Sequence, residues 1–235
     1  MRCKIADLIV EIPAAGGMVP RCKEYLCDPK ISPDIVIREE DFCADRWSAV
    51  SAEMLPYMET GQLFYIHLLK HSGLMLHASA VELDGKAYLF SGDCGAGKST
   101  HTALWQQVFG VNVQIFNDDK PALRCLDGTW YAYGTPWCGK NGININTKVP
   151  LAGICFLRKA DSNRIRRISA REALPKIFKQ TIRCFDTTEN LDLMLAHVDK
   201  LVRKIPVFEL ENRPEPEAAQ LSYETMRCCA KEMGL

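Results

Sequence analysis

The sequence lacks an excess of either charge, because 29 lysine and arginine residues balance 29 aspartate and glutamate residues over 235 positions. Nucleic-acid and acidic-membrane binders owe their affinity to clustered basic charge, so this balance argues against both classes. The uncharged residues 99–117 contain several glutamine and asparagine side chains and are unsuited to crossing a bilayer. Asp7 and Glu11 interrupt the apolar run that a secretory signal would need. We therefore expect a cytoplasmic protein that binds neither nucleic acid nor membrane.

Paired cysteine motifs are also absent. The eleven cysteines are odd in number, are scattered from Cys3 to Cys229 and show no CxxC spacing. Disulfide frameworks are typical of small secreted domains, and zinc sites need ligands at short, fixed spacings, so neither is expected here. We expect reduced thiols that act as small buried hydrophobic residues.

Internal repeats and low-complexity tracts are missing too, and the composition, with 47% hydrophobic and 25% charged residues, is that of a globular chain. The pattern of strands around one strand–loop–helix unit predicts an α/β fold. Residues 1–72 predict a β-rich segment, with strands in 5–12 and 34–38, and a helix over 49–70 that packs on the core. Residues 73–235 predict a mixed-sheet core. Its strands are expected over 74–83, 86–90, 111–116, 122–126, 129–133, 151–157, 164–168 and 207–210, and its helices up to 109 and over 169–182, 188–204 and 215–231. The strand over 164–168 is expected to pair with that over 151–157.

The main motif is a glycine-rich loop that reads Gly92-Asp93-Cys94-Gly95-Ala96-Gly97-Lys98-Ser99-Thr100. It follows a predicted strand and opens a predicted helix, which is the context that the Walker A phosphate-binding pattern requires. Glycines let the backbone wrap a polyphosphate, and the loop N–H groups and the helix N-terminus face the anion. Lys98 is expected to bridge the β- and γ-phosphates of a nucleoside triphosphate such as ATP, and the Ser99 hydroxyl is expected to bind Mg²⁺.

A pair of adjacent acids, Asp118-Asp119, ends the next predicted strand, 20 positions after Lys98. Adjacent carboxylates can divide two tasks, in which one binds the metal ion and the other accepts the proton of an attacking hydroxyl. We assign Asp118 as the base and Asp119 as a metal ligand together with Ser99, and the reverse assignment stays open. Asn117 is expected to be a structural residue of the same turn.

His77 is a further candidate catalytic residue. It lies in the predicted strand over 74–83, which a hairpin turn brings back beside the strand that leads into the loop. The alternative is a hydrogen-bonded structural histidine. His101 is expected on the surface of the helix after the loop, and Lys140, in a glycine-rich stretch, is either a substrate contact or an ordinary exposed lysine.

Together these residues resemble the catalytic domain of bacterial HPr serine kinase/phosphorylases, in the phosphoenolpyruvate-carboxykinase-like group of P-loop proteins. The similarity is specific over residues 73–123. Four segments carry it: His77-Ala78-Ser79-Ala80, Asp84-Gly85, Ser91 to Ser99, and Asn117-Asp118-Asp119. The sequence departs from the family at Ala78, where the family has glycine, at Thr100, where it commonly has glutamate, and in the lack of an Arg-Gly-Leu-Gly signature.

The resemblance implies a P-loop kinase core that transfers the γ-phosphoryl group of ATP, with Mg²⁺, to a serine-type hydroxyl. It implies that Asp118, Asp119, His77 and Lys98 form the catalytic centre, and it makes a homo-oligomer a further expectation. The departures favour an acceptor other than HPr, such as another protein, a peptide or a small molecule. An alternative of a different class is a nucleotide-binding regulatory or assembly module without phosphoryl transfer, which the missing signature favours and the intact acid pair disfavours.

Overall fold

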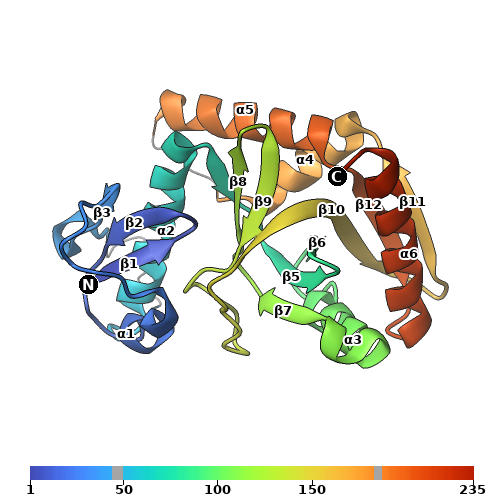
Figure 1. Ribbon diagram of the computed structural model, residues 1–235, viewed down its shortest axis with the longest axis horizontal. Coiled ribbons are helices and arrows are strands. Elements are labelled where there is room, and N and C mark those ends of the chain that lie inside the picture. Colours follow the sequence, from blue (N-terminus) through green and yellow to red (C-terminus); the bar gives the residue numbers. More distant parts are fainter. Residues whose placement is uncertain (44–49, 183–186) are drawn as a thin grey trace.

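The computed structural model describes residues 1–43, 50–182 and 187–235. Within these residues, a nine-stranded mixed sheet carries helices on both faces, and a three-stranded sheet lies to one side (Figure 1). The elements are, in chain order, β1 (Arg2–Ile5), β2 (Leu8–Glu11), α1 (Met18–Arg21), β3 (Ile35–Val36), α2 (Leu55–Leu68), β4 (Gly73–Met75), β5 (Ala78–Leu83), β6 (Lys86–Ser91), α3 (Lys98–Phe109), β7 (Gln114–Asn117), β8 (Ala122–Leu126), β9 (Thr129–Tyr133), β10 (Lys148–Lys159), β11 (Arg164–Ile168), α4 (Ala170–Gln180), α5 (Thr188–Lys204), β12 (Val207–Asn212) and α6 (Pro216–Glu232).

The N-terminal portion forms the small sheet, in the order β1-β2-β3. The strand predicted in residues 5–12 is observed as β2, but it begins only at Leu8, because the chain turns back on itself after β1, which ends at Ile5. Ala6 and Asp7 adopt left-handed conformations, with φ of 52° and 60°, and two successive positive φ values are the geometry of a tight hairpin turn. Hydrophobic alternation identified the β character of this segment but not the reversal within it.

Helix α2 connects the N-terminal portion to the main sheet. It begins at Leu55, with a proline in its first turn, so the predicted helix starts later than expected among residues 50–70; residue 49 lies outside the described residues. Its buried aromatic residues share one hydrophobic cluster with β1 to β3, and Phe64 stacks on Trp137 of the main body with ring centroids 4.8 Å apart. The predicted packing of this helix on the core is therefore observed, whereas the boundary between residues 72 and 73 stays a prediction.

The long strand β10 holds the main sheet together. Its first residues pair antiparallel with β9, and the rest lies parallel between β6 and β12. The strand order is β4-β8-β9-β10-β6-β5-β7, so the predicted mixed sheet is confirmed. The predicted pairing of residues 164–168 with 151–157 is wrong, because β12 lies beside β10 and β11 pairs with the outer side of β12.

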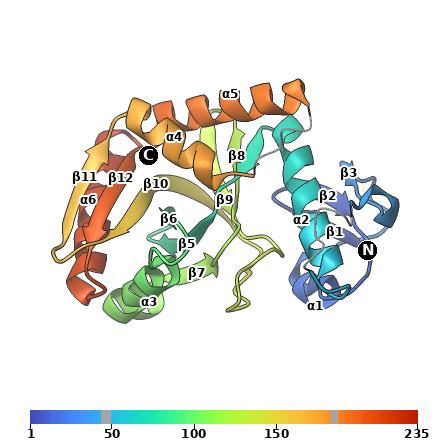
Figure 2. The ribbon, with the colours of Figure 1, turned by 180° about the vertical axis from the view of Figure 1, so that it is seen from behind.

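Side-chain alternation along the central strands assigns helices to the two faces of the sheet. On β6, Ala87 and Leu89 belong to the hydrophobic cluster that includes α4 and α5, whereas Tyr88 and Phe90 belong to the cluster that includes α3 and α6. The two helix pairs accordingly cover opposite faces (Figures 1 and 2). The central strands are thus buried on both sides, which explains their almost continuous apolar sequence.

The strand directions bring several loops to one edge of the sheet. β6, β10 and β12 are parallel, and β7 runs the same way because β6 and β7 are both antiparallel to β5. The glycine-rich loop after β6 and the acid pair after β7 therefore lie at the same edge, together with the start of β5. In α/β sheets this carboxyl edge is the usual place for ligand binding.

Two predictions from composition can be compared with the described residues. Six of the described cysteines are buried, as expected for small hydrophobic residues: Cys3, Cys22, Cys125, Cys138, Cys155 and Cys229. Cys43, Cys94 and Cys228 are exposed, and Cys184 lies outside the described residues. No helix in the described part of the chain has both the length and the apolar character needed to cross a membrane.

Gly134, just after β9, lies where two backbone segments approach closely. A β-carbon there would stand 1.7 Å from the carbonyl oxygen of Ile145 and 3.1 Å from that of Phe116. Because backbone must move to relieve this overlap, we expect Gly134→Ala to lower the free energy of unfolding by about 3 kcal/mol. Urea unfolding followed by circular dichroism measures the effect. Gly17→Ala is the control, because the atom nearest to its β-carbon is at the end of the Arg21 side chain, which can shift without a movement of the backbone; equal midpoints for the two variants would contradict the prediction.

Candidate functional site

The glycine-rich loop between β6 and α3 has the backbone that a phosphate-binding loop needs. Gly92, Gly95 and Gly97 have φ of 144°, 77° and 101°, a region that side chains with a β-carbon rarely adopt. α3 begins at Lys98 without a side-chain cap, so the N–H groups of its first turn stay available to an anion. The donor set and the conformation of the loop therefore fit a polyphosphate.

The Lys98 side chain folds back along the loop. Its amine donates hydrogen bonds to the carbonyl oxygens of Gly92, at 3.0 Å, and Asp93, at 3.3 Å. Burial lowers the pKa of Lys98, and the negative charge of Asp119 partly opposes this effect. The charge of Asp119 therefore acts on the Lys98 amine.

One cavity of about 890 Å³ gathers the predicted site residues. Its lining includes His77, Cys94, Gly95, Ala96, Gly97, Lys98, Ser99, Thr100, Asp118, Asp119 and Lys140. Gly92 and Asp93 line an adjacent hollow of about 480 Å³, which shares the loop with the first cavity. These residues come from four separate segments of the sequence, and the fold brings them together in one cavity.

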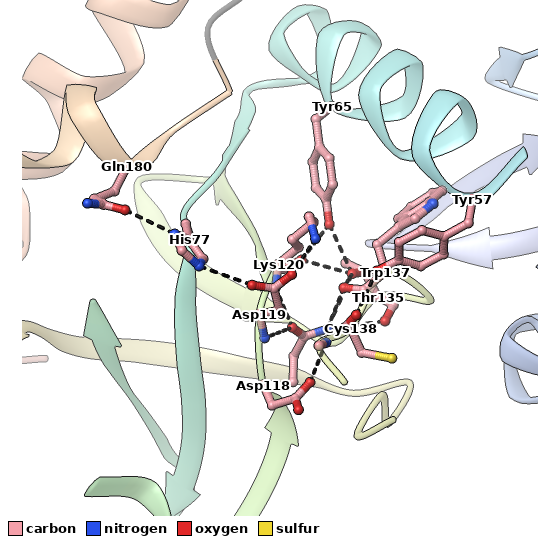
Figure 3. A network of polar contacts seen from close by, with 12 residues as sticks. Tyr57, Tyr65, His77, Asp118, Asp119, Lys120, Thr135, Trp137, Cys138 and Gln180 are labelled. Atoms are coloured by element: carbon pink, nitrogen blue, oxygen red, sulfur yellow. Dashed lines mark hydrogen bonds and ion pairs between the residues drawn. The ribbon is translucent and has the colours of Figure 1, made fainter. Parts of the chain in front are cut away.

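Asn117 organises the turn that carries the two acids. Its Oδ1 accepts hydrogen bonds from the backbone N–H of Asp119, at 3.1 Å, and of Lys120, at 2.8 Å, while its Nδ2 donates to the carbonyl oxygen of Thr135 at 3.1 Å. The predicted structural role of Asn117 is therefore observed. With the turn held in this way, the adjacent carboxylates of Asp118 and Asp119 point in different directions (Figure 3).

The Asp118 carboxylate is buried and is fixed at one oxygen only. Its Oδ1 accepts a hydrogen bond of 2.6 Å from the backbone N–H of Gly139. No donor among the described residues is bonded to its Oδ2, and the residue lines the large cavity. Asp118 thus has an oxygen available for a cation or another ligand.

The Asp119 carboxylate, in contrast, is held at both oxygens. His77 Nε2 lies 3.1 Å from its Oδ1, and the Lys120 amine forms an ion pair with its Oδ2 (Figure 3). Burial raises the pKa of Asp119, but the hydrogen bond from His77 and the charge of Lys120 outweigh burial and lower the pKa to about 2. Asp119 is therefore ionised at neutral pH and has a fixed orientation.

His77 lies in a break between two strands. The expected strand over 74–83 is interrupted, because β4 ends at Met75 and pairs with β8, whereas β5 begins at Ala78 and pairs with β6. The predicted position of His77 beside the strand that enters the loop is confirmed, since the Ser91 hydroxyl donates a hydrogen bond of 2.8 Å to its carbonyl oxygen. His77 Nδ1 lies 3.1 Å from Gln180 Oε1.

Two members of the site, Gln180 and Lys120, were not predicted from the sequence, and His101 was misplaced. Gln180, at the end of α4, carries no local signal, because its polar contacts come from segments far away in the chain. His101 was expected on a helix surface, but α6 covers it, with its Nε2 3.1 Å from the Ser222 hydroxyl. Burial lowers the pKa of His101 to about 4, so this ring is neutral and belongs to the packing between α3 and α6.

Comparisons with known proteins add only a remote structural likeness. No family model and no curated protein matches the sequence. Among solved structures, the HPr(Ser) kinase/phosphatase from Coxiella burnetii is similar with a TM-score of 0.42 and 14% sequence identity, over 68% of this chain and 92% of that chain. A likeness of this size assigns neither a family nor an activity.

The contacts of Asp119 predict a loss of stability in acid. Its pKa in the folded protein lies below the ordinary value of 3.8, so the ionised carboxylate stabilises the fold above about pH 4, and this contribution disappears as the pH falls toward about 2. Wild-type protein should lose about 2 kcal/mol more than Asp119→Asn between these limits. Urea unfolding at a series of pH values measures the difference, and parallel losses in the two proteins would contradict the role of these contacts.

Proposed function

We propose that the protein is an ATP- and magnesium-dependent phosphotransferase that moves the γ-phosphoryl group to a hydroxyl of a protein, peptide or small molecule. The observation that carries the proposal is the meeting of the glycine-rich loop, Lys98 and two adjacent acids in a single cavity. The resemblance of the same segments to HPr serine kinases, seen in the sequence, supports the same activity.

The donor side of the proposed site is built from the loop and α3. Backbone N–H groups of the loop and of the first turn of α3 would bind the phosphate oxygens. Lys98 would exchange its two loop carbonyl partners for phosphate oxygens and would neutralise charge that develops during transfer. Lys140 lines the same cavity, and we propose it as a further contact to phosphate or acceptor.

We propose Ser99 and Asp118 as the ligands of Mg²⁺, which when bound would neutralise charge on the transferred group. Asp118 has a free oxygen facing the cavity, whereas both oxygens of Asp119 are already bonded. Mg²⁺ commonly takes one or two protein oxygens and completes its shell with phosphate and water, so this small ligand set fits. This choice reverses the assignment made from the sequence, in which Asp119 bound the metal and Asp118 was the base.

We propose Asp119 as the group that receives the proton of the acceptor hydroxyl. A second cavity of about 330 Å³ lies beside it, and of the described residues only His77 and Asp119 line both cavities. An acceptor in the second cavity would therefore meet the donor at Asp119. Since a carboxylate offers about four lone-pair sites, and His77 and Lys120 occupy two of them, the Asp119 carboxylate can still accept the hydrogen bond of an acceptor hydroxyl.

In the proposed reaction the acceptor oxygen forms a new bond to the γ-phosphorus, and the bond from this phosphorus to the β–γ bridging oxygen breaks. The products are a phosphorylated acceptor and ADP, and the hydroxyl proton passes to Asp119. A carboxylate with a pKa of about 2 is a weak base, but phosphoryl transfer with a loose transition state depends mainly on positioning and charge neutralisation. His77 and Lys120 supply the positioning of Asp119.

Two amide substitutions test the division of tasks between the acids. We expect Asp119→Asn to reduce transfer from γ-labelled ATP by roughly a hundred-fold or more while ATP affinity stays near the wild-type value. We expect Asp118→Asn to raise the Mg²⁺ concentration needed for half-maximal activity, because a metal ligand is weakened. Candidate peptides and serine-like hydroxyl compounds serve as acceptors, with calorimetry for binding.

Asp127→Asn, at the exposed turn between β8 and β9, is the matched control and should behave as wild type. Wild-type turnover in Asp119→Asn would contradict its role as the base. Tight ATP binding by the wild-type protein without transfer to any acceptor would contradict the phosphotransferase proposal and would favour the regulatory module.

A further inference from the structure

We propose that Gln180 is a positioning residue that fixes the ring of His77 and thereby joins the glycine-rich loop to the acid pair. Its side chain lies between Asp93 of the loop and His77, and His77 in turn contacts Asp119. The series Asp93–Gln180–His77–Asp119 thus runs from one side of the proposed site to the other. The role in transfer rests on the proposed function, whereas the arrangement of the ring does not.

Asp93 determines which way the Gln180 amide points. The amide nitrogen Nε2 lies 3.0 Å from Asp93 Oδ1, and an ionised carboxylate can only accept hydrogen bonds. Two hydrogen bonds and the nearby Lys179 ammonium lower the pKa of Asp93, so the carboxylate is ionised at neutral pH. Nε2 must therefore face Asp93, which turns the amide oxygen Oε1 toward His77.

The amide orientation decides whether Nδ1 of the His77 imidazole carries a proton. Oε1 of Gln180 is an acceptor and lies 3.1 Å from Nδ1, so Nδ1 must be the donor. Which ring nitrogens carry protons is usually ambiguous from heavy atoms alone, but here the Asp93 carboxylate, acting through Gln180, assigns Nδ1 as a donor. Nε2 lies 3.1 Å from Oδ1 of the Asp119 carboxylate, which also only accepts (Figure 3). Both ring nitrogens therefore donate, and the proton on Nδ1 is the one that depends on Gln180.

The surroundings of Gln180 restrict its movement. The residue is the last of α4, its side chain is buried, and its carbonyl oxygen accepts a hydrogen bond of 2.7 Å from the backbone N–H of His77. Gln180 therefore holds His77 at two points, one through the backbone and one through the side chain. A substitution of the side chain removes only the contact to the ring, which makes its role separable from that of the backbone.

Lys179 provides a matched comparison. Its amine contacts the same Asp93 carboxylate, at 2.7 Å, but does not contact His77, and both partners of this pair are more than half exposed. An exposed ion pair contributes little to stability. Lys179→Gln thus removes a neighbour of Asp93 on the same helix while the contact between Gln180 and His77 remains.

The test is nitrogen-15 NMR of the His77 ring at pH 8, where an unperturbed imidazole is neutral, with His77→Asn identifying its signals. In wild-type protein and in Lys179→Gln, we expect Nδ1 to show the pattern of a protonated nitrogen. In Gln180→Leu, we expect Nδ1 to move toward an unprotonated or averaged nitrogen, because among the described residues Asp119 is then the acceptor that the ring retains, and it holds the ring proton at Nε2. An unchanged Nδ1 signal in Gln180→Leu would overturn the proposal.

Should Gln180→Leu fail to fold, Asp93→Ala tests the same series at an exposed position. Without the Asp93 carboxylate the Gln180 amide is free to reverse, so the nitrogen-15 signal of Nδ1 should again move away from that of a protonated nitrogen. An unchanged Nδ1 signal would overturn the proposal in this case too. Because this readout needs no substrate, it remains valid even if the protein transfers no phosphate.

Kinetics then test the positioning role. Gln180→Leu should lower kcat by roughly ten- to a hundred-fold, because Asp119 loses a fixed partner, while KM for ATP changes little. Gln180→Glu keeps an acceptor toward Nδ1 and should restore most of kcat, with a higher KM for ATP because its charge faces Asp93. Full activity in Gln180→Leu, or no rescue in Gln180→Glu, would overturn the positioning role while leaving the phosphotransferase proposal intact.

Discussion

The register between β5 and β6 is the constraint on which the rest of the site depends. Ala78 lies opposite Ser91, so His77 stands beside the residue that precedes the glycine-rich loop. The same Ala78 donates its backbone N–H to the carbonyl oxygen of Asp119 at 3.1 Å, which ties the acid pair to the hairpin. A slip by one residue would exchange the two faces of β5 and would separate all three groups. One hairpin therefore sets the distances between loop, histidine and acids.

Adjacent residues can serve two tasks here because their side chains meet different partners. The Asn117 side chain holds the turn, and the backbone after it directs Asp118 toward Gly139 and Asp119 toward His77. Asp118 keeps one oxygen free in the large cavity, whereas Asp119 is bonded at both oxygens at the junction of two cavities. The physical difference between the acids is thus created by their partners and not by their own chemistry, which is the same for both.

What the sequence could predict follows from the range of the interactions involved. The glycine-rich loop, its flanking strand and helix and the adjacent acids are local features, so their positions were predicted from short-range patterns. The turn between β1 and β2 and the break at His77 depend on single backbone conformations or on which strand pairs with which, and hydrophobic alternation does not report these. The burial of His101 and the position of Gln180 depend on α6 and α4, whose contacts arise only once the chain has folded.

The N-terminal portion has a physical reason to be part of the same structure as the site. The Tyr65 hydroxyl of α2 donates to the carbonyl oxygen of Lys120, and the Tyr57 hydroxyl donates to that of Cys138 at 2.6 Å, next to Gly139. These contacts fix the two segments that position Asp119 and Asp118. Both tyrosines belong to the hydrophobic cluster shared with the small sheet. The packing of that sheet against α2 therefore helps to hold the turn that carries Asp118 and Asp119 in place. The small sheet and α2 therefore act as the support of the proposed catalytic turn.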